Sequence, residues 1–181
     1  MTGQRFDRER VEKFLRVAGE RLEGEWLLIG GGAAAAWFAP SRTTEDLDII
    51  GLSGSQQDRF ALMELAASEG LPIEAVNSAA DFFVRRVPDW RSHLLELHRG
   101  KNAIVYRPDA TLFLRLKIGR LSEVDLEDCL ALLDHCDRTG ESVTRAEVRA
   151  ALVALPATPD EALRGRRATL SERLLQAPLL P

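Results

Sequence analysis

The chain is poor in the residues that most often build disulfide frameworks and zinc sites, with two cysteines and three histidines among 181 residues. Cys129 and Cys136 fall in one predicted helix, so they do not suggest the disulfide framework of a small secreted domain. His93, His98 and His135 lack the spacing of zinc ligands, and a site built on His135 and the two cysteines would lack a fourth ligand. We therefore expect neither a disulfide framework nor a structural zinc.

Long hydrophobic runs are also absent. No apolar run approaches the roughly 18 residues that a membrane-spanning helix needs. The first ten residues, MTGQRFDRER, contain no apolar signal core. Hydrophobic residues make up 45% of the chain and charged residues 29%, which is ordinary for a globular protein. The sequence therefore predicts a cytoplasmic protein with no membrane partner.

Charge of one sign is not in large excess, because the formal net charge is only −4. The charges are unevenly distributed, however. Residues 81–120 carry nine Lys or Arg against four Asp or Glu, whereas residues 121–161 carry three against ten. The basic section could meet a triphosphate or an RNA backbone, and it could equally be a solvated face.

One stretch, WLLIGGGAAAAWFAPSRTTEDLDIIG (residues 26–51), carries most of the information. Trp26–Ile29 has the length and apolarity of a buried strand. Three glycines follow, and they allow a sharp turn with no Cβ between the backbone N–H groups and a ligand. Ala33–Phe38 then predicts a short helix that Pro40 stops. A phosphate at the start of this helix would gain from its N–H groups and its dipole.

An acid pair follows on the next predicted strand. Asp46 and Asp48 are two residues apart, so they share one face of a strand, while Leu47 and Ile49 share the other. Two neighbouring carboxylates repel each other unless a cation lies between them. Mg²⁺ prefers such oxygen ligands and usually also holds substrate phosphates. The turn and the acid pair together predict metal-assisted chemistry on a nucleoside triphosphate (NTP).

These motifs resemble those of a known family. The glycine turn followed by an acid pair resembles the minimal nucleotidyltransferase superfamily. It is most similar to the branch that holds toxins of abortive-infection type toxin–antitoxin pairs and many uncharacterised bacterial proteins. The motifs that carry the resemblance are Gly30-Gly31-x-Ala33 and Arg42-x-Thr44-x-Asp46-Leu47-Asp48. The resemblance extends, more weakly, to about residue 137.

The resemblance implies roles for the residues of the turn and the acid pair. Asp46 and Asp48 would bind Mg²⁺, and Gly30 and Gly31 would bind the β- and γ-phosphates through backbone N–H groups. Glu74 matches the place of a third carboxylate on the following strand, although the family more often has Asp there. Its other interpretation is an edge-strand residue that faces water.

The resemblance also assigns residues outside that centre. Arg42 and Thr44 would position a phosphate or brace the acid pair, unless they lie in a solvent-facing loop. Lys117 would contact the triphosphate, and Asp125 would orient Lys117 or activate the incoming nucleophile. Val124 departs from the family, which usually has a basic residue at that position. The alternatives are a surface lysine and an aspartate favoured by a helix N-terminus.

The sequence predicts an α/β fold, with a nucleotidyltransferase-like small mixed sheet flanked by helices and a helical C-terminal section. Residues 1–137 would form the nucleotidyltransferase-like domain, and residues 138–181 a helical extension packed on it. We expect a strand at residues 73–76 and another at 102–106, whereas residues 81–87 are ambiguous and could be a strand. A helix after Ser55 is expected to bury Phe60, Met63, Ala66 and Ala67.

The predicted activity is Mg²⁺-dependent transfer of a nucleoside monophosphate from an NTP to an acceptor hydroxyl. The resemblance implies an RNA, tRNA or protein acceptor and a toxin–antitoxin role with an operon-encoded partner protein. One alternative is a catalytically inactive module of the same fold that binds nucleotide or a partner. Another is a dinucleotide-binding protein, because Gly30-x-Gly32-x-x-Ala35 also fits that pattern, with Asp48 as the ribose-binding acid.

Overall fold

The structure, a computed structural model, describes residues 5–78 and 80–176. The chain divides into two compact units, Met1–Pro108 and Asp109–Pro181. The division lies earlier than the predicted boundary at residue 137, because the two helices that follow Pro108 group with the C-terminal helices. Each unit is described by itself.

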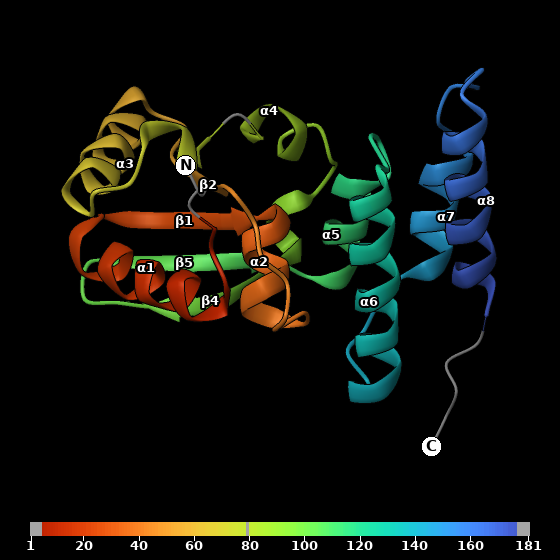
Figure 1. The fold of residues 1–181 in the computed structure, drawn as a ribbon, viewed down its shortest axis with the longest axis horizontal. Helices are drawn as coiled ribbons and strands as arrows, with labels where there is room; N and C mark the ends of the chain where they lie inside the picture. The colour runs from red at the N-terminus through yellow and green to blue at the C-terminus, as the bar shows by residue number, and fades with distance from the viewer. Residues whose placement is uncertain (1–4, 79, 177–181) are drawn as a thin grey trace. The chain divides into compact units, whose positions relative to one another are not determined.

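The first unit is built on a five-stranded mixed sheet in the order β3-β2-β1-β5-β4 (Figure 1). β1 pairs parallel with β5 and antiparallel with β2, β2 pairs parallel with β3, and β4 pairs antiparallel with β5. The α/β class and the small mixed sheet are therefore confirmed. The strands are β1 (Gly24–Ile29), β2 (Leu47–Gly51), β3 (Val76–Asn77), β4 (Leu94–Arg99) and β5 (Ala103–Pro108).

The predicted buried strand forms the centre of this sheet. Residues 26–29 of β1 are all buried, which matches the unbroken apolar run of the sequence. On β2, Leu47 and Ile49 are buried, whereas Asp48 between them is only half-buried. The alternation predicted for this strand is thus present, although Asp46 lies just before its first residue.

The first unit differs from the prediction at residues 73–76 and at the buried face of one helix. Its helices are α1 (Arg8–Arg21), α2 (Gly30–Trp37), α3 (Gln56–Ser68) and α4 (Asp81–Val84), with 3-10 turns η1 (Ile73–Ala75) and η2 (Trp90–His93). The predicted strand at 73–76 is wrong for its first three residues, which form η1. The ambiguous segment at 81–87 begins as a helix, and an ion pair between Arg85 and Asp81 at 2.8 Å spans that helical turn.

The predicted buried face of α3 is also largely wrong. α3 buries Leu62, Leu65 and Ala66, which recur at helical spacing. Phe60 and Met63 lie on its exposed face, and the Phe60 side chain is 64% exposed. The predicted and the observed apolar faces share Ala66. The observed face, with Leu62 and Leu65, is the one that packs on the rest of the unit. An apolar count alone could not choose between them.

The second unit is helical within its described residues and contains α5 (Ala110–Lys117), α6 (Glu123–Thr139), α7 (Arg145–Val153) and α8 (Glu161–Leu175). Asp109 caps α5 by accepting a hydrogen bond from the Leu112 N–H at 2.8 Å. Gly140 ends α6 with φ of +74°, a conformation that favours glycine. Across the part of the chain that the structure describes, no helix has the length and apolarity needed to cross a membrane.

Candidate functional site

The glycine turn and the acid strand meet in the first unit. The register pairs Ile29 of β1 with Asp48 of β2, so Asp48 lies beside the residue where β1 ends and α2 begins. Gly30 is the first residue of α2 and has φ of +64°. A Cβ at Gly30 would lie 2.9 Å from Asp48 Oδ2. The Asp48 carboxylate therefore lies against the backbone at the start of α2, where only glycine fits easily.

Gly31 is equally confined, but by different groups. A Cβ there would lie 2.7 Å from Thr44 Oγ1 and 3.4 Å from an Arg42 guanidinium nitrogen. Thr44 is buried, and its backbone is held by a two-way pairing with Phe6. The Arg42 guanidinium also donates to the carbonyl of Thr43. A hydroxyl and a cation thus flank the first turn of α2.

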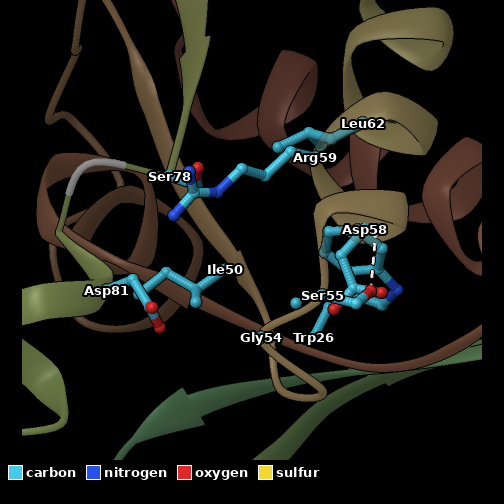
Figure 2. Close-up of a pocket in the computed structure, with 10 residues that line it drawn as sticks. Trp26, Ile50, Gly54, Ser55, Asp58, Arg59, Leu62, Ser78 and Asp81 are labelled. Carbon is cyan, nitrogen blue, oxygen red and sulfur yellow. Dashed lines mark hydrogen bonds between the residues drawn. The ribbon is translucent and has the colours of Figure 1, made fainter.

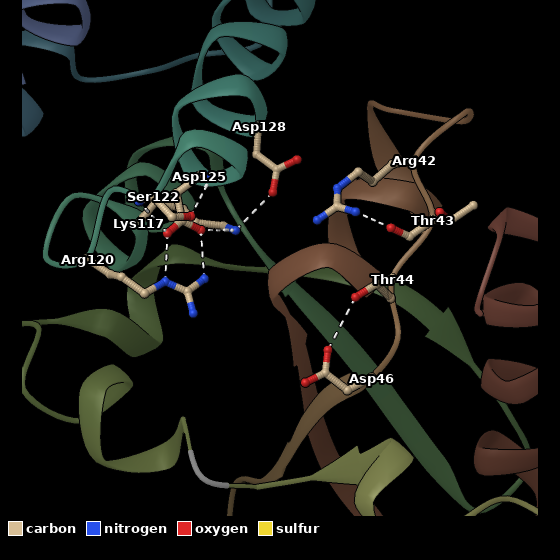
Figure 3. Close-up of polar contacts among 9 residues, drawn as sticks. All are labelled: Arg42, Thr43, Thr44, Asp46, Lys117, Arg120, Ser122, Asp125 and Asp128. Atoms are coloured by element: carbon tan, nitrogen blue, oxygen red, sulfur yellow. Dashed lines mark hydrogen bonds and ion pairs between the residues drawn. The ribbon is translucent and has the colours of Figure 1, made fainter. Parts of the chain in front are cut away.

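Asp46 joins this group through Thr44. Thr44 Oγ1 donates to Asp46 Oδ1 at 3.3 Å, and Figure 3 shows the two side chains directed toward each other. Asp46 is exposed, whereas Asp48 is half-buried. The residues between Gly30 and Asp48 therefore bring two carboxylates, a hydroxyl and a guanidinium to the region where α2 starts. We call Gly30, Gly31, Arg42, Thr44, Asp46 and Asp48 the turn site.

Glu74 does not occupy the place that its order in the sequence suggested. It lies on η1 and is exposed, three residues before the β3 residue that pairs with Asp48. That residue is Asn77. The side chain beside Asp48 on the next strand is therefore an amide, which offers an oxygen ligand without a charge.

The turn site fits a substrate-bound Mg²⁺ better than a metal held by protein alone. Among the residues that the structure describes, no group of three or more His, Cys, Asp or Glu side chains could hold a metal ion. Mg²⁺ is usually bound through one or two carboxylates, with substrate phosphates and waters as its other ligands. Asp46 and Asp48 supply that number of carboxylates, next to N–H groups suited to phosphate.

The tight contact at Gly31 gives a testable prediction. Gly31→Ala should lower the free energy of unfolding by about 1–3 kcal/mol, because the added methyl group overlaps the Thr44 side chain. Urea denaturation measures the change. Gly165→Ala is the control, because Gly165 is exposed within α8 with nothing near its added methyl, and alanine there should stabilise by about 0.5–1 kcal/mol. Equal effects of the two substitutions would contradict the confinement of Gly31.

The second unit contains a buried ionic cluster that includes both of its predicted site residues. Lys117 Nζ donates to Asp125 Oδ1 at 2.8 Å and to Asp128 Oδ2 at 2.9 Å (Figure 3). Arg120 donates two hydrogen bonds to the Asp125 carboxylate, at 2.8 and 2.9 Å. Asp125 also forms a capping box with Ser122 at the start of α6. Lys117 and Asp125 therefore do contact each other, as the resemblance implied.

Charges in this cluster stabilise one another against burial. Burial alone would lower the pKa of Lys117, but the charge of Asp128 and the hydrogen bonds that Lys117 donates to both aspartates outweigh it and raise that pKa. Burial alone would raise the pKa of Asp125. Hydrogen bonds from Arg120 and Lys117, with the charge of Lys117 and the Ser122 N–H, outweigh burial and hold that pKa well below its usual range.

Asp128 and Arg120 were not predicted as members of this cluster. One signal was available, since Asp125 and Asp128 are three residues apart and therefore share a helix face. Their common partner could not be found from spacing, because Lys117 lies on another helix. Burial of the nearby Cys129 raises the pKa of its thiol to about 12, so Cys129 is a protonated core residue.

Hollows elsewhere on the first unit do not coincide with the turn site. One is lined by ten residues that include Gly54, Asp58, Arg59 and Ser78 (Figure 2), and its free space of about 10 Å³ suits a single water molecule. A larger one of about 200 Å³ is lined by Phe6, Arg10, Lys13, Phe14, Glu69 and Leu71. The first is lined by two carboxylates, Asp58 and Asp81, each in the first turn of a helix, but its space is too small for a phosphate. The second is lined by one carboxylate, Glu69, so the turn site remains the better candidate for phosphate.

Comparisons with known proteins add no relative. The chain matches no protein-family model, and neither a curated protein nor a solved structure is significantly similar to it.

Proposed function

We propose that the chain is an Mg²⁺-dependent nucleotidyltransferase that moves a nucleoside monophosphate from an NTP to an acceptor hydroxyl on RNA, tRNA or protein. The observation that carries the proposal is the approach of the Asp48 carboxylate to the backbone of Gly30 at the start of α2. In this arrangement, one short segment of chain supplies N–H groups that can bind a phosphate and a carboxylate that can bind the counter-ion of that phosphate. The resemblance of the same residues to the minimal nucleotidyltransferase superfamily also supports it.

Each residue of the turn site has a part in this proposal. The backbone N–H groups of Gly30 and Gly31 bind the β- and γ-phosphates, where the helix dipole favours negative charge. Arg42 adds a cation next to Gly31, and Thr44 orients the Asp46 carboxylate through its hydrogen bond. Asp46 and Asp48 hold Mg²⁺. When bound, Mg²⁺ would lower the pKa of the acceptor hydroxyl and neutralise the leaving pyrophosphate.

The dinucleotide-binding alternative fits the strand directions less well. Its glycine pattern functions in a unit where the strands before and after the helix are parallel. Here β1 and β2 are antiparallel. Asp48 also pairs with the last residue of β1, so its carboxylate lies at the start of α2. The acid is therefore beside the phosphate position, whereas the dinucleotide-binding pattern needs it at a ribose.

A second candidate is a non-catalytic module of the same fold that binds nucleotide or an operon-encoded partner protein. The position of Glu74 favours it, because Asp48 has Asn77 as its β3 neighbour, and no third carboxylate is grouped with the acid pair among the described residues. A module of this kind would bind Mg²⁺–NTP at the turn site without releasing pyrophosphate.

Metal removal tests the proposal. The purified chain should release pyrophosphate from at least one NTP when Mg²⁺ and a mixture of cellular RNA and protein acceptors are present. EDTA should abolish that release, because Asp46 and Asp48 then repel each other and the phosphates. Radiolabel transferred from an α-labelled NTP identifies the acceptor.

Calorimetry separates the two candidates. Tight Mg²⁺-dependent NTP binding with no pyrophosphate release across all acceptors would favour the binding module. Absence of any Mg²⁺-dependent NTP binding would contradict both. The residue between the acids, Glu45, is exposed, and Glu45→Gln serves as the control that should bind and turn over NTP as the wild type does.

A further inference from the structure

Exposed aromatic side chains gather on the segment from α4 to η2 in the first unit. Phe82 and Phe83 are 56% and 63% exposed, and their ring centroids lie 5.6 Å apart in an edge-to-face arrangement. Adjacent phenylalanines on a four-residue helix would normally be expected to bury at least one ring. Neither ring is buried here, so both are available to a partner.

Arginines contact these aromatic rings at close range. The guanidinium carbon of Arg86 lies 3.9 Å from the Phe82 centroid, and that of Arg91 lies 4.6 Å from the Trp90 centroid. Both distances are within the range of a cation–π contact. We call Phe82, Phe83, Arg86, Trp90 and Arg91 the aromatic–arginine surface. It interleaves flat π faces with cations, whereas a protein core would use apolar side chains alone.

Arg91 of this surface and the neighbouring Arg85 also hold the segment against the β2–α3 turn of the same unit. Arg91 donates to the carbonyl of Leu52 at 3.1 Å. Arg85 places a guanidinium nitrogen 2.8 Å from where a Cβ would lie at Gly54, and it is paired with Asp81. The backbone beneath the rings is therefore fixed by side chains of its own segment. A fixed platform loses little conformational entropy when a partner binds.

We propose that the aromatic–arginine surface binds single-stranded nucleic acid, with bases stacked on Phe82 and Phe83 and phosphates paired with Arg86 and Arg91. Single strands are bound by this combination of exposed aromatic rings and cations, because every base has a π face and every linkage carries a charge. Charge complementarity favours this partner over an apolar peptide, which would leave the guanidinium groups without counter-charges. The idea that this strand is also the acceptor of the transfer reaction rests on the proposed function, but binding of the strand to this surface does not.

Binding is tested without NTP or Mg²⁺, by fluorescence anisotropy of labelled 12-nucleotide single strands of RNA and of DNA. Phe82→Ala and Phe83→Ala should each weaken binding about tenfold, which is the usual loss for one stacked base. If Arg86 and Arg91 each pair with one phosphate, log K should fall with log salt with a slope of about −1.4, and Arg86→Gln should reduce that slope by about half.

Phe60→Ala is the matched control, because Phe60 is as exposed as Phe83 but lies on α3, outside this surface. It should leave the affinity unchanged. Equal binding of single and double strands, or no change in Phe82→Ala and Phe83→Ala, would overturn the proposal. A wild-type protein that binds no nucleic acid would also overturn it. The surface would then be a self-association face if Phe82→Ala and Phe83→Ala lost self-association in sedimentation, or a membrane-binding face if they lost binding to anionic lipid vesicles. A difference in affinity between the RNA and the DNA strands would identify which nucleic acid the surface prefers. These affinities are measured without NTP, so they stay informative even if the chain transfers no nucleotide.

Discussion

Asp48→Asn should reduce Mg²⁺-dependent NTP consumption by about a thousandfold or more, while the protein still folds. Asparagine keeps the shape of the side chain but removes the charge that lies against the start of α2 and that would bind Mg²⁺ in the proposed function. Metal-ion stabilisation of a phosphoryl transition state contributes several kcal/mol, and about 4 kcal/mol corresponds to a thousandfold. Initial rates of pyrophosphate release at saturating NTP measure the loss.

A structural role for Asp48 predicts a different result. A carboxylate near a helix N-terminus stabilises the helix by about 0.3–1 kcal/mol. If that were its whole contribution, Asp48→Asn would lower the free energy of unfolding slightly and leave turnover intact. Urea denaturation and turnover of Asp48→Asn and the Glu45→Gln control therefore distinguish the two roles, because Glu45 is a neighbouring exposed acid.

The turn site could be predicted from sequence because its parts are close in the chain. An apolar run, three glycines, a short helix and a second apolar strand leave few arrangements for residues 26–51. The two-residue period then directs Asp48 away from Leu47 and Ile49. What the sequence did not provide was the register, and the pairing of Asp48 with Ile29 is what brings its carboxylate to Gly30.

Other features depended on packing choices that one sequence does not reveal. Glu74 was expected on a strand from its order, but Ile73–Ala75 forms a 3-10 turn, so Asn77 takes the place beside Asp48. Phe60 fits an apolar helix face as well as Leu62 does, and tertiary contact selected Leu62. Asp128 joins Lys117 across two helices, and no spacing rule links residues on separate elements.

The second large effect is expected at the buried cluster of the second unit. Lys117→Met should lower the free energy of unfolding by about 3–5 kcal/mol, because it removes the cation that pairs with the buried carboxylates of Asp125 and Asp128. Lys101→Met is the control, since Lys101 is exposed, and it should change stability by less than about 0.5 kcal/mol. Urea denaturation of both variants gives the comparison.

The pH dependence should change with the same substitution. Because the folded-state pKa of Asp125 is depressed, its contribution to stability is present above its usual pKa of about 4 and is lost as the pH falls. Without Lys117 that depression becomes smaller, so the stability of Lys117→Met should fall less steeply in acid than that of the wild type. Lys117 has the opposite sign, because its raised pKa stabilises the fold below about 10.5 and that contribution is lost at higher pH.

A double substitution distinguishes a structural cluster from a catalytic lysine. Lys117→Met combined with Asp128→Leu removes both members of one pair, and it should recover much of the stability lost in Lys117→Met, since apolar replacements of buried pairs are often neutral. Asp125 keeps Arg120 and the Ser122 N–H as partners in both variants. If Lys117→Met were as stable as the wild type and lost only NTP turnover, the ionic cluster would not stabilise the packing of α5 on α6. Contact with the triphosphate, which the resemblance implies for Lys117, would then be the better account.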